Sequence, residues 1–286
     1  MTDVTSRARP LAEAVVASAR AGEPDRYIAA LLAPAPARPK LLTLAAFSSE
    51  LRRTAALVRE PTMGELRLQW WREALAQGAA TRTGNPIADA LRDLARKEAL
   101  PPLLLGELID AHSRNLAPEP VGDDAALNAY LWQSEGVAFL LAAQLLGGRS
   151  QAAMAAAAAS ARAYGLVRLL QGLPRALARR RLVLPRSYLA AVGLEPEALF
   201  AGTGEARLLD LLGELFADIR RHLAAGRQHV AKLPRAVGPA FLPLALVASY
   251  VRRLERAGGD IVREEAGIAP LARVAIMAAA HWLGRI

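Results

Sequence analysis

Apolar residues recur every three or four positions along most of this chain, and an alternation with a period of two never persists. The stretch containing Leu208, Leu212, Leu215 and Ile219 is typical, because these side chains would line one face of a helix. Alanine, leucine, arginine and glutamate, which favour helices, recur at this spacing almost throughout. The pattern predicts an all-α protein.

Proline- and glycine-containing stretches divide the chain into helices. None of these breaks is long or polar enough to act as a linker between domains. We therefore expect one helical bundle spanning residues 1–286, with 1–22 as a candidate for a loosely attached N-terminal helix. The predicted breaks include 32–40, 60–64, 83–86, 100–102, 117–124, 147–150, 192–197, 201–204, 232–238 and 257–259.

The composition limits the chemistry that the chain can perform. It has no cysteine and four scattered histidines, which excludes thiolate metal sites and leaves no zinc signature, so a metal would need carboxylates. The net charge is +9, and of 36 basic residues only Lys40, Lys97 and Lys232 are lysine. Arginine can pair with anionic groups, or it can simply cover solvated helix faces. Nucleic acid is a poor candidate partner, because aromatic residues are only 5% and do not interleave with a basic block.

Two segments of the chain indicate where the protein is located. Charges at Asp3, Arg7 and Arg9 interrupt any apolar core of an export signal, so a cytoplasmic protein is expected, with a peripheral contact to the inner membrane as an open alternative. The uncharged segment 236–251 is shorter than the roughly 20 residues that a spanning helix needs. It is either a buried terminal helix or a partner or membrane contact.

Several stretches far apart in the chain resemble one known family. They are "DRYIAALLAPAPARPKLLTLAAF" (25–47), "LRLQWWREAL" (66–75) and "GLVRLLQGLPRALARRRLVLP" (165–185). In this order they resemble the squalene and phytoene synthase family. Pro174 and the C-terminal stretch 239–261 resemble most the branch that contains the mitochondrial assembly factor of respiratory complex I and its bacterial relatives.

The resemblance implies an all-α fold of the isoprenoid synthase type, a single-domain bundle around a central cavity. Active members condense two prenyl diphosphates head to head, and two aspartate-rich motifs hold the magnesium ions that neutralise the leaving diphosphate. Counted from Ala46 and Phe47, the first motif falls on Arg52, Arg53 and Ala56, so its aspartates are replaced.

The second motif is also lost. It falls on 173–185, where Arg175 is followed by Ala176 and no acid occurs. Other acids at helical spacing, Asp89 with Asp93 and the series Asp210, Glu214 and Asp218, have the pattern of solvated helix faces. We therefore predict no metal site and no cofactor, with Mg²⁺ required only if prenyl transfer is retained.

Residues that the resemblance places around the cavity are candidates for a relic pocket. On a helical wheel Arg52 and Arg53 point away from the apolar arc of Phe47 and Leu51, while Glu50 and Thr54 fall on its edge. Each candidate has an equally available structural explanation, as a packed side chain or a surface ion pair. The candidates are Glu50, Arg52, Arg53, Thr54, Glu65, Gln69, Tyr130, Glu135, Arg168, Gln171 and Arg175.

Three functions follow from this interpretation. The leading one is a non-catalytic binding or assembly factor linked to respiratory complex I, with a protein partner in that assembly. The alternative is a prenyl-diphosphate transferase with an altered site, acting on farnesyl or geranylgeranyl diphosphate. The third is a module that binds an isoprenoid or another lipid in the old cavity.

Overall fold

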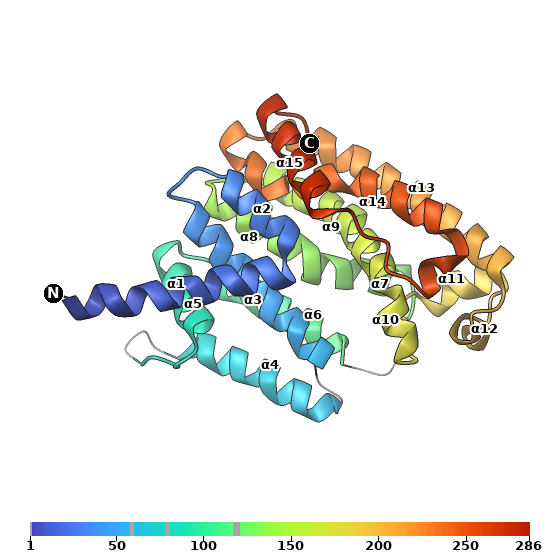
Figure 1. Cartoon of the computed structure of the whole chain (residues 1–286), viewed down its shortest axis with the longest axis horizontal. Coiled ribbons are helices and arrows are strands. Elements are labelled where there is room, and N and C mark those ends of the chain that lie inside the picture. Colours follow the sequence, from blue (N-terminus) through green and yellow to red (C-terminus); the bar gives the residue numbers. More distant parts are fainter. Residues whose placement is uncertain (1, 58–59, 78–80, 117–120) are drawn as a thin grey trace.

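The computed structural model describes residues 2–57, 60–77, 81–116 and 121–286, with side chains described from residue 12 onward and not at 55–57. It contains helices and no strand in these ranges, which confirms the predicted all-α class (Figure 1). The helices are α1 Thr2–Gly22, α2 Pro24–Leu32, α3 Arg38–Leu57, α4 Pro61–Ala76, α5 Pro86–Lys97, α6 Pro102–Arg114, α7 Asp124–Leu131, the π-helical turn η1 Trp132–Gly136, α8 Val137–Leu145, α9 Gln151–Gln171, α10 Leu173–Ala178, α11 Arg186–Ala191, α12 Pro196–Ala201, α13 Glu205–Val230, the 3₁₀ turn η2 Arg235–Phe241, α14 Leu244–Ala257, the 3₁₀ turn η3 Gly258–Val262 and α15 Pro270–Leu283.

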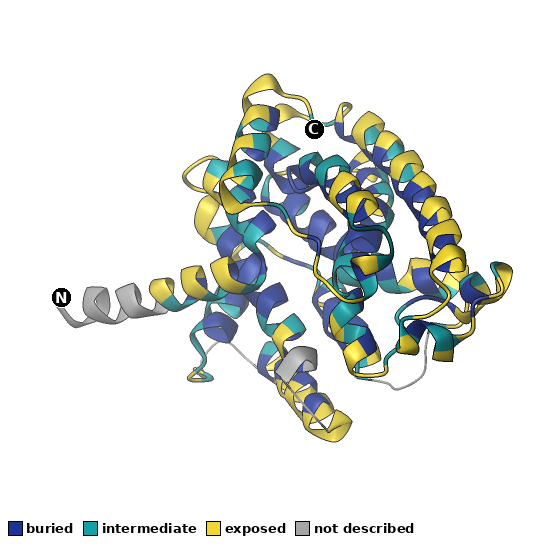
Figure 2. Cartoon of the chain, turned by 45° about the vertical axis from the view of Figure 1, so that its right-hand side comes forward, coloured by how far each residue is buried: buried dark blue, intermediate teal, exposed yellow. Residues whose placement is uncertain are grey.

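Helix α8 forms the centre of the bundle. Its sequence, VAFLLAAQL, is apolar on every side, and all of its residues except Gln144 are buried. A helix that is hydrophobic all round must be covered by others. Figure 2 shows this buried centre, with the exposed positions confined to the outer faces of the surrounding helices.

The alanine-rich helix α9 packs along α13, the longest helix of the fold. Ala153, Ala156 and Ala157 are buried, and Gly226 of α13 lies beside Ser160 of α9. Small side chains let two helix axes approach closely. The alanine run is therefore a packing feature, and it holds the C-terminal end of α9 firmly in the centre of the molecule.

The segment 236–251 is buried. It forms η2 and the first half of α14, and Phe241, Leu244, Val247 and Val251 are all closed off from solvent. Of the two alternatives that the sequence left open for this segment, the structure shows the buried helix, although α15 and not this segment is the C-terminal helix. Helix α1 packs on α3 through Val15, Ala19 and Gly22, where a Cβ would overlap Ser49.

Candidate functional site

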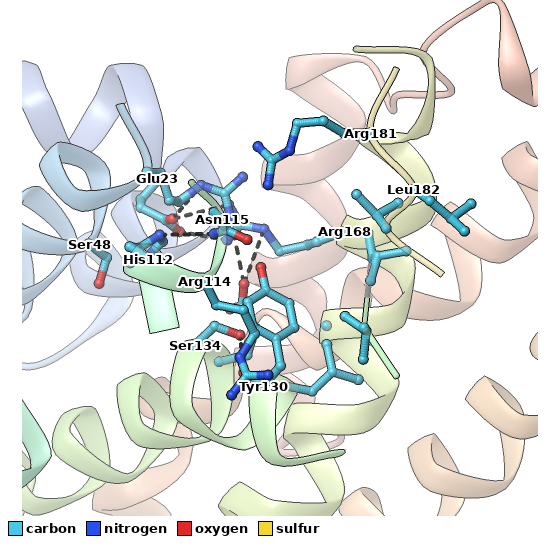
Figure 3. Close-up of a pocket in the computed structure, with 18 of the residues that line it drawn as sticks. Glu23, Ser48, His112, Arg114, Asn115, Tyr130, Ser134, Arg168, Arg181 and Leu182 are labelled. Carbon is cyan, nitrogen blue, oxygen red and sulfur yellow. Dashed lines mark hydrogen bonds and ion pairs between the residues drawn. The ribbon is translucent and has the colours of Figure 1, made fainter. Parts of the chain in front are cut away.

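A pocket of about 210 Å³ opens where α2, α3, α6, η1 and α9 meet, and residues 181–183 close one side of it. Figure 3 shows polar side chains converging on it from all of these elements. Five charged residues fill its inner end, namely Glu23, Arg26, Arg52, Glu135 and Arg168. We call these five residues the ion cluster.

Local sequence explains how the two carboxylates are placed. Glu23 is the residue immediately before α2, and Pro24 occupies the first helical position. The helix then places Arg26 about one turn after Glu23, where the two side chains form an ion pair. Glu135 lies in the π-helical turn η1, between α7 and α8. A π-turn widens the helix by one residue and is frequent at functional sites.

The ion cluster is held by short contacts. Arg26 donates to Glu23 Oε2 at 2.8 Å and to Glu135 Oε2 at 2.6 Å. Arg168 donates to both oxygens of Glu23, at 2.7 and 3.0 Å, and its Nε lies 3.5 Å from Glu135 Oε1. Arg52 lies farther out, with its Nε 3.3 Å from Glu23 Oε1 and Nη1 3.6 Å from Glu135 Oε1. Three cations thus surround two buried anions.

The charges of the ion cluster keep both acids ionised. Burial alone would raise the pKa of Glu23, but the guanidinium groups of Arg168, Arg26 and Arg52 outweigh it and hold that pKa well below its ordinary value. The pKa of Glu135 is lowered by Arg168, Arg26 and Arg52 against the same burial. Both carboxylates therefore stay charged at neutral pH and remain bound to arginine.

Part of the remaining pocket wall is polar, and the rest is apolar, formed by Val121, Leu131, Leu169, Leu182 and Val183. His112 and Asn115, at the end of α6, lie 3.3 Å apart between Nδ1 and Nδ2, and Tyr130 also lines the pocket. Burial, with the nearby charge of Arg52, lowers the pKa of His112 to about 3. His112 is accordingly neutral under physiological conditions and adds no charge to the pocket.

The charge balance decides what this pocket can hold. The ion cluster alone has one more cation than anion, and Arg114 and Arg181 also line the pocket. Surplus positive charge repels a divalent cation, and Mg²⁺ needs carboxylate oxygens that are not already paired. Across the described side chains, no three His, Asp or Glu residues are grouped so that they could hold a metal ion. The pocket suits an anionic or neutral group and not a metal.

Four of the candidate residues come together in this pocket, namely Arg52, Tyr130, Glu135 and Arg168. Arg52 is directed to the ion cluster although the helical wheel placed it off the apolar arc. The physical reason is that this part of the pocket is polar, so the residue that faces it lies beside the apolar stripe of α3 and not on it.

The other candidates on α3 and α4 lie outside the pocket. Glu50 accepts a hydrogen bond from Ser18 at 2.9 Å, and Arg53 is exposed beside it. Thr54 donates to the backbone carbonyl of Glu50. Glu65 accepts from Ser113 and Gln69 donates to Glu73, both near the surface. Glu50 and Glu65 each join two helices, the other three make contacts within their own helix, and none of the five lines this pocket.

The remaining two candidates attach the C-terminal region. Gln171 donates to the carbonyl of Ala266 at 3.1 Å, and Arg175 pairs with Glu265 in solvent. Two residues that the sequence interpretation did not select, Glu23 and Arg26, are central to the ion cluster. Their signal was present, because a Glu before a helix-starting Pro with Arg three residues later predicts a local ion pair.

Two acids that were expected on solvated faces are buried. Asp89 accepts from the backbone and side chain of Thr83, each at 2.9 Å, so it anchors the loop before α5. Asp218 accepts from Arg162 and Arg221, each at 2.6 Å. The expectation of solvent exposure was wrong for both, because each carboxylate finds hydrogen-bond partners inside the protein. Neither belongs to a metal-binding group.

The chain is similar to known proteins in family, sequence and fold. A family model described as squalene/phytoene synthase matches residues 19–275. The NADH dehydrogenase (ubiquinone) complex I, assembly factor 6 of Mus musculus is 26% identical over 238 residues, which cover 83% of this chain and 72% of that protein.

Two solved structures share the fold. Squalene synthase HpnC from Alicyclobacillus acidocaldarius superposes with a TM-score of 0.76 at 18% identity, over 87% of this chain and 95% of that one. A dehydrosqualene synthase in complex with a ligand gives 0.79 at 12% identity, over 98% and 99%. The fold is therefore that of the isoprenoid synthases, as the sequence predicted.

Proposed function

We propose that this chain, which belongs to the squalene/phytoene synthase family, works by binding and not by prenyl transfer, as an assembly or accessory factor for respiratory complex I. The observation that carries the proposal is the ion cluster. Arg52 stands where the family places a metal-binding aspartate, and it pairs with buried acids of its own chain. A site built in this way has no carboxylates left for the ions that diphosphate departure requires.

The size of the pocket supports the same conclusion. Its volume of about 210 Å³ is below the roughly 300–1,000 Å³ of ordinary small-molecule sites. A head-to-head synthase must hold two prenyl chains at once. The side chains that fill the inner end of this pocket leave too little room for both substrates.

The link to complex I comes from the relatives. The mouse protein that this chain resembles over most of its length is named as an assembly factor of that complex. We assign the same role to this chain, with a subunit or another factor of complex I as its partner. In the described ranges no helix is long and apolar enough to cross a membrane. We place the protein in the cytoplasm, in peripheral contact with the inner membrane where the complex is assembled.

A deletion strain tests the assembly role. Without this protein, we expect the NADH:ubiquinone oxidoreductase activity of isolated membranes and the intact complex on a native gel to fall severalfold, and the wild-type gene should restore both. Succinate dehydrogenase activity, which does not depend on complex I, serves as the control. Normal complex I in the deletion strain would refute the proposal.

A separate experiment tests the absence of prenyl transfer. The purified protein, incubated with farnesyl or geranylgeranyl diphosphate and millimolar Mg²⁺, should release no pyrophosphate. Its melting temperature should be the same in Mg²⁺ and in chelator, whereas a metal present at 100 times its Kd would add about 2.7 kcal/mol of stability. Turnover, or a Mg²⁺-dependent rise in melting temperature, would establish the transferase instead.

A further inference from the structure

The outward face of the C-terminal helix α15 is apolar and uncovered. Leu271, Trp282 and Leu283 are 85%, 79% and 71% exposed, and Val274 is exposed between them. Leu271 and Trp282 lie three turns apart, so their directions differ by only about 20° around the helix axis. Val274 and Leu283 lie about 60° and 120° from Leu271, on opposite sides of it, so the four residues occupy the exposed half of the helix, which we call the α15 face.

The opposite side of the same helix is fixed to the bundle. Met277 and Ala280 are buried, and α15 packs on α2 and α14. Arg273 reaches inward, where its Nε lies 3.1 Å from Asp25 Oδ1. The helix therefore cannot rotate to bury the α15 face. A helix that is apolar on both sides requires a second apolar environment.

The charged side chains beside the C-terminal end of α15 are basic. No acidic side chain occurs in 270–286, and the last residues carry the exposed Arg285. Arg235 of η2 is exposed, and its guanidinium lies 3.9 Å from the position that a Cβ on Gly284 would take. Glu265, which precedes the helix, is held away by its pair with Arg175 of α10. The rim near Trp282 is therefore cationic.

We infer that the α15 face lies on the surface of a bilayer containing acidic lipids. Leucine and valine would enter the boundary between headgroups and acyl chains, where an amphipathic helix docks without spanning. Trp282 has the ring that prefers this boundary, since one edge can hydrogen-bond while the rest is apolar. Arg235 and Arg285 would pair with lipid phosphates.

A second exposed apolar stripe shows why the charged residues around an apolar surface matter. Met63, Leu66 and Trp70 are exposed on α4, at the lower edge of the molecule in Figure 1, whereas α15 lies at the upper edge. That helix carries Glu65 and Glu73 together with Arg67 and Arg72, so its charges balance and give no net attraction to an acidic membrane. The α4 stripe does not qualify, and it provides a matched control.

Vesicle co-sedimentation of the whole purified protein tests the inference. We expect binding to vesicles that contain phosphatidylglycerol, weak binding to phosphatidylcholine alone, and weakening as salt rises. The double substitution Trp282→Ala with Leu283→Ser should weaken binding at least tenfold. The pair Arg235→Gln with Arg285→Gln should remove the preference for acidic lipid. All four side chains are exposed, so the fold should survive.

The control substitutes the other stripe, Met63→Ser with Trp70→Ala, and should leave vesicle binding unchanged. Tryptophan emission should shift to the blue with acidic vesicles, and Trp282→Phe should abolish that shift. No binding to acidic vesicles, or equal binding by the α15 and α4 variants, would overturn the inference. So would a dimer in solution that the Trp282→Ala and Leu283→Ser substitutions dissociate, because the α15 face would then join two copies. Vesicle binding does not depend on the proposed role in complex I.

Discussion

At the scale of single residues, the carboxylate of Glu23 is the group on which the ion cluster depends. It is 1% exposed and lies within 3.3 Å of nitrogen atoms of Arg26, Arg52 and Arg168. Removing one partner of a buried ion pair leaves uncompensated charge, which costs about 3–5 kcal/mol. We expect Glu23→Gln to lower the free energy of unfolding by this amount in urea titrations.

The matched control for Glu23→Gln is Glu265→Gln. Its pair with Arg175 is exposed on both sides, and exposed pairs contribute at most about 1 kcal/mol. Similar losses for the two substitutions would show that the ion cluster is no more important than a surface pair.

The sequence identified Arg52, Glu135 and Arg168 through family resemblance, but it could not show that Glu23, more than 100 positions before Glu135, completes the group.

His112 should give the protein a distinct dependence on pH. The folded pKa is lowered to about 3, whereas an unfolded histidine titrates near about 6.5. Between these values the unfolded state binds more protons, so stability is full above about pH 6.5 and falls as the pH drops towards 3. In His112→Gln, the slope of unfolding free energy against pH between these limits should decrease by up to about 1.4 kcal/mol per pH unit. An unchanged slope would contradict the neutral, buried state of His112.

At the scale of helices, the sequence predicted where helices begin and end, but it did not predict an irregular turn inside a helical segment. Helix α5 begins at Pro86 after Asn85, whose side chain accepts from the backbone of Ile87 and Ala88, and the predicted break at 83–86 contains both signals. The π-helical turn η1 has no such signal. Around it, Leu131 packs against Gly165 of α9 and Gly136 lies beside Ala161 of α9, contacts between distant segments that the chain alone does not reveal.

Gly165 of α9 tests that packing. A Cβ there would lie 2.7 Å from Cδ2 of the buried Leu131 and 3.4 Å from Cγ of Glu135. Gly165→Ala should therefore displace the helix that supports the pocket and destabilise the protein by about 1–3 kcal/mol. Gly213→Ala on α13 is the control, because nothing lies within 4 Å of its Cβ position. There the same change should stabilise by about 0.4–1 kcal/mol. Equal effects at the two sites in thermal denaturation would rule out close packing at Gly165.

At the scale of the whole molecule, Asp25 connects the two ends of the chain. Its carboxylate accepts from Tyr164 of α9 at 2.8 Å and from Tyr250 of α14 at 3.0 Å, and it faces Arg273 of α15. Residues separated by more than 200 positions thus share one buried acid. Helical periodicity predicted a single bundle without indicating this connection, because a polar contact between distant segments leaves no periodic pattern.

This connection predicts that the chain unfolds as one unit. In Asp25→Ala the two tyrosine hydroxyls lose their acceptor and Arg273 loses its counter-charge, and each unsatisfied buried group costs about 1–3 kcal/mol. If the N-terminal and C-terminal helices form one cooperative structure, helical circular dichroism, tryptophan fluorescence and calorimetry should report the same midpoint. All three midpoints should then move down together in the variant. A variant in which only part of the helical signal melts early would show instead that α14 and α15 unfold separately, and that the bundle consists of two units held together by Asp25.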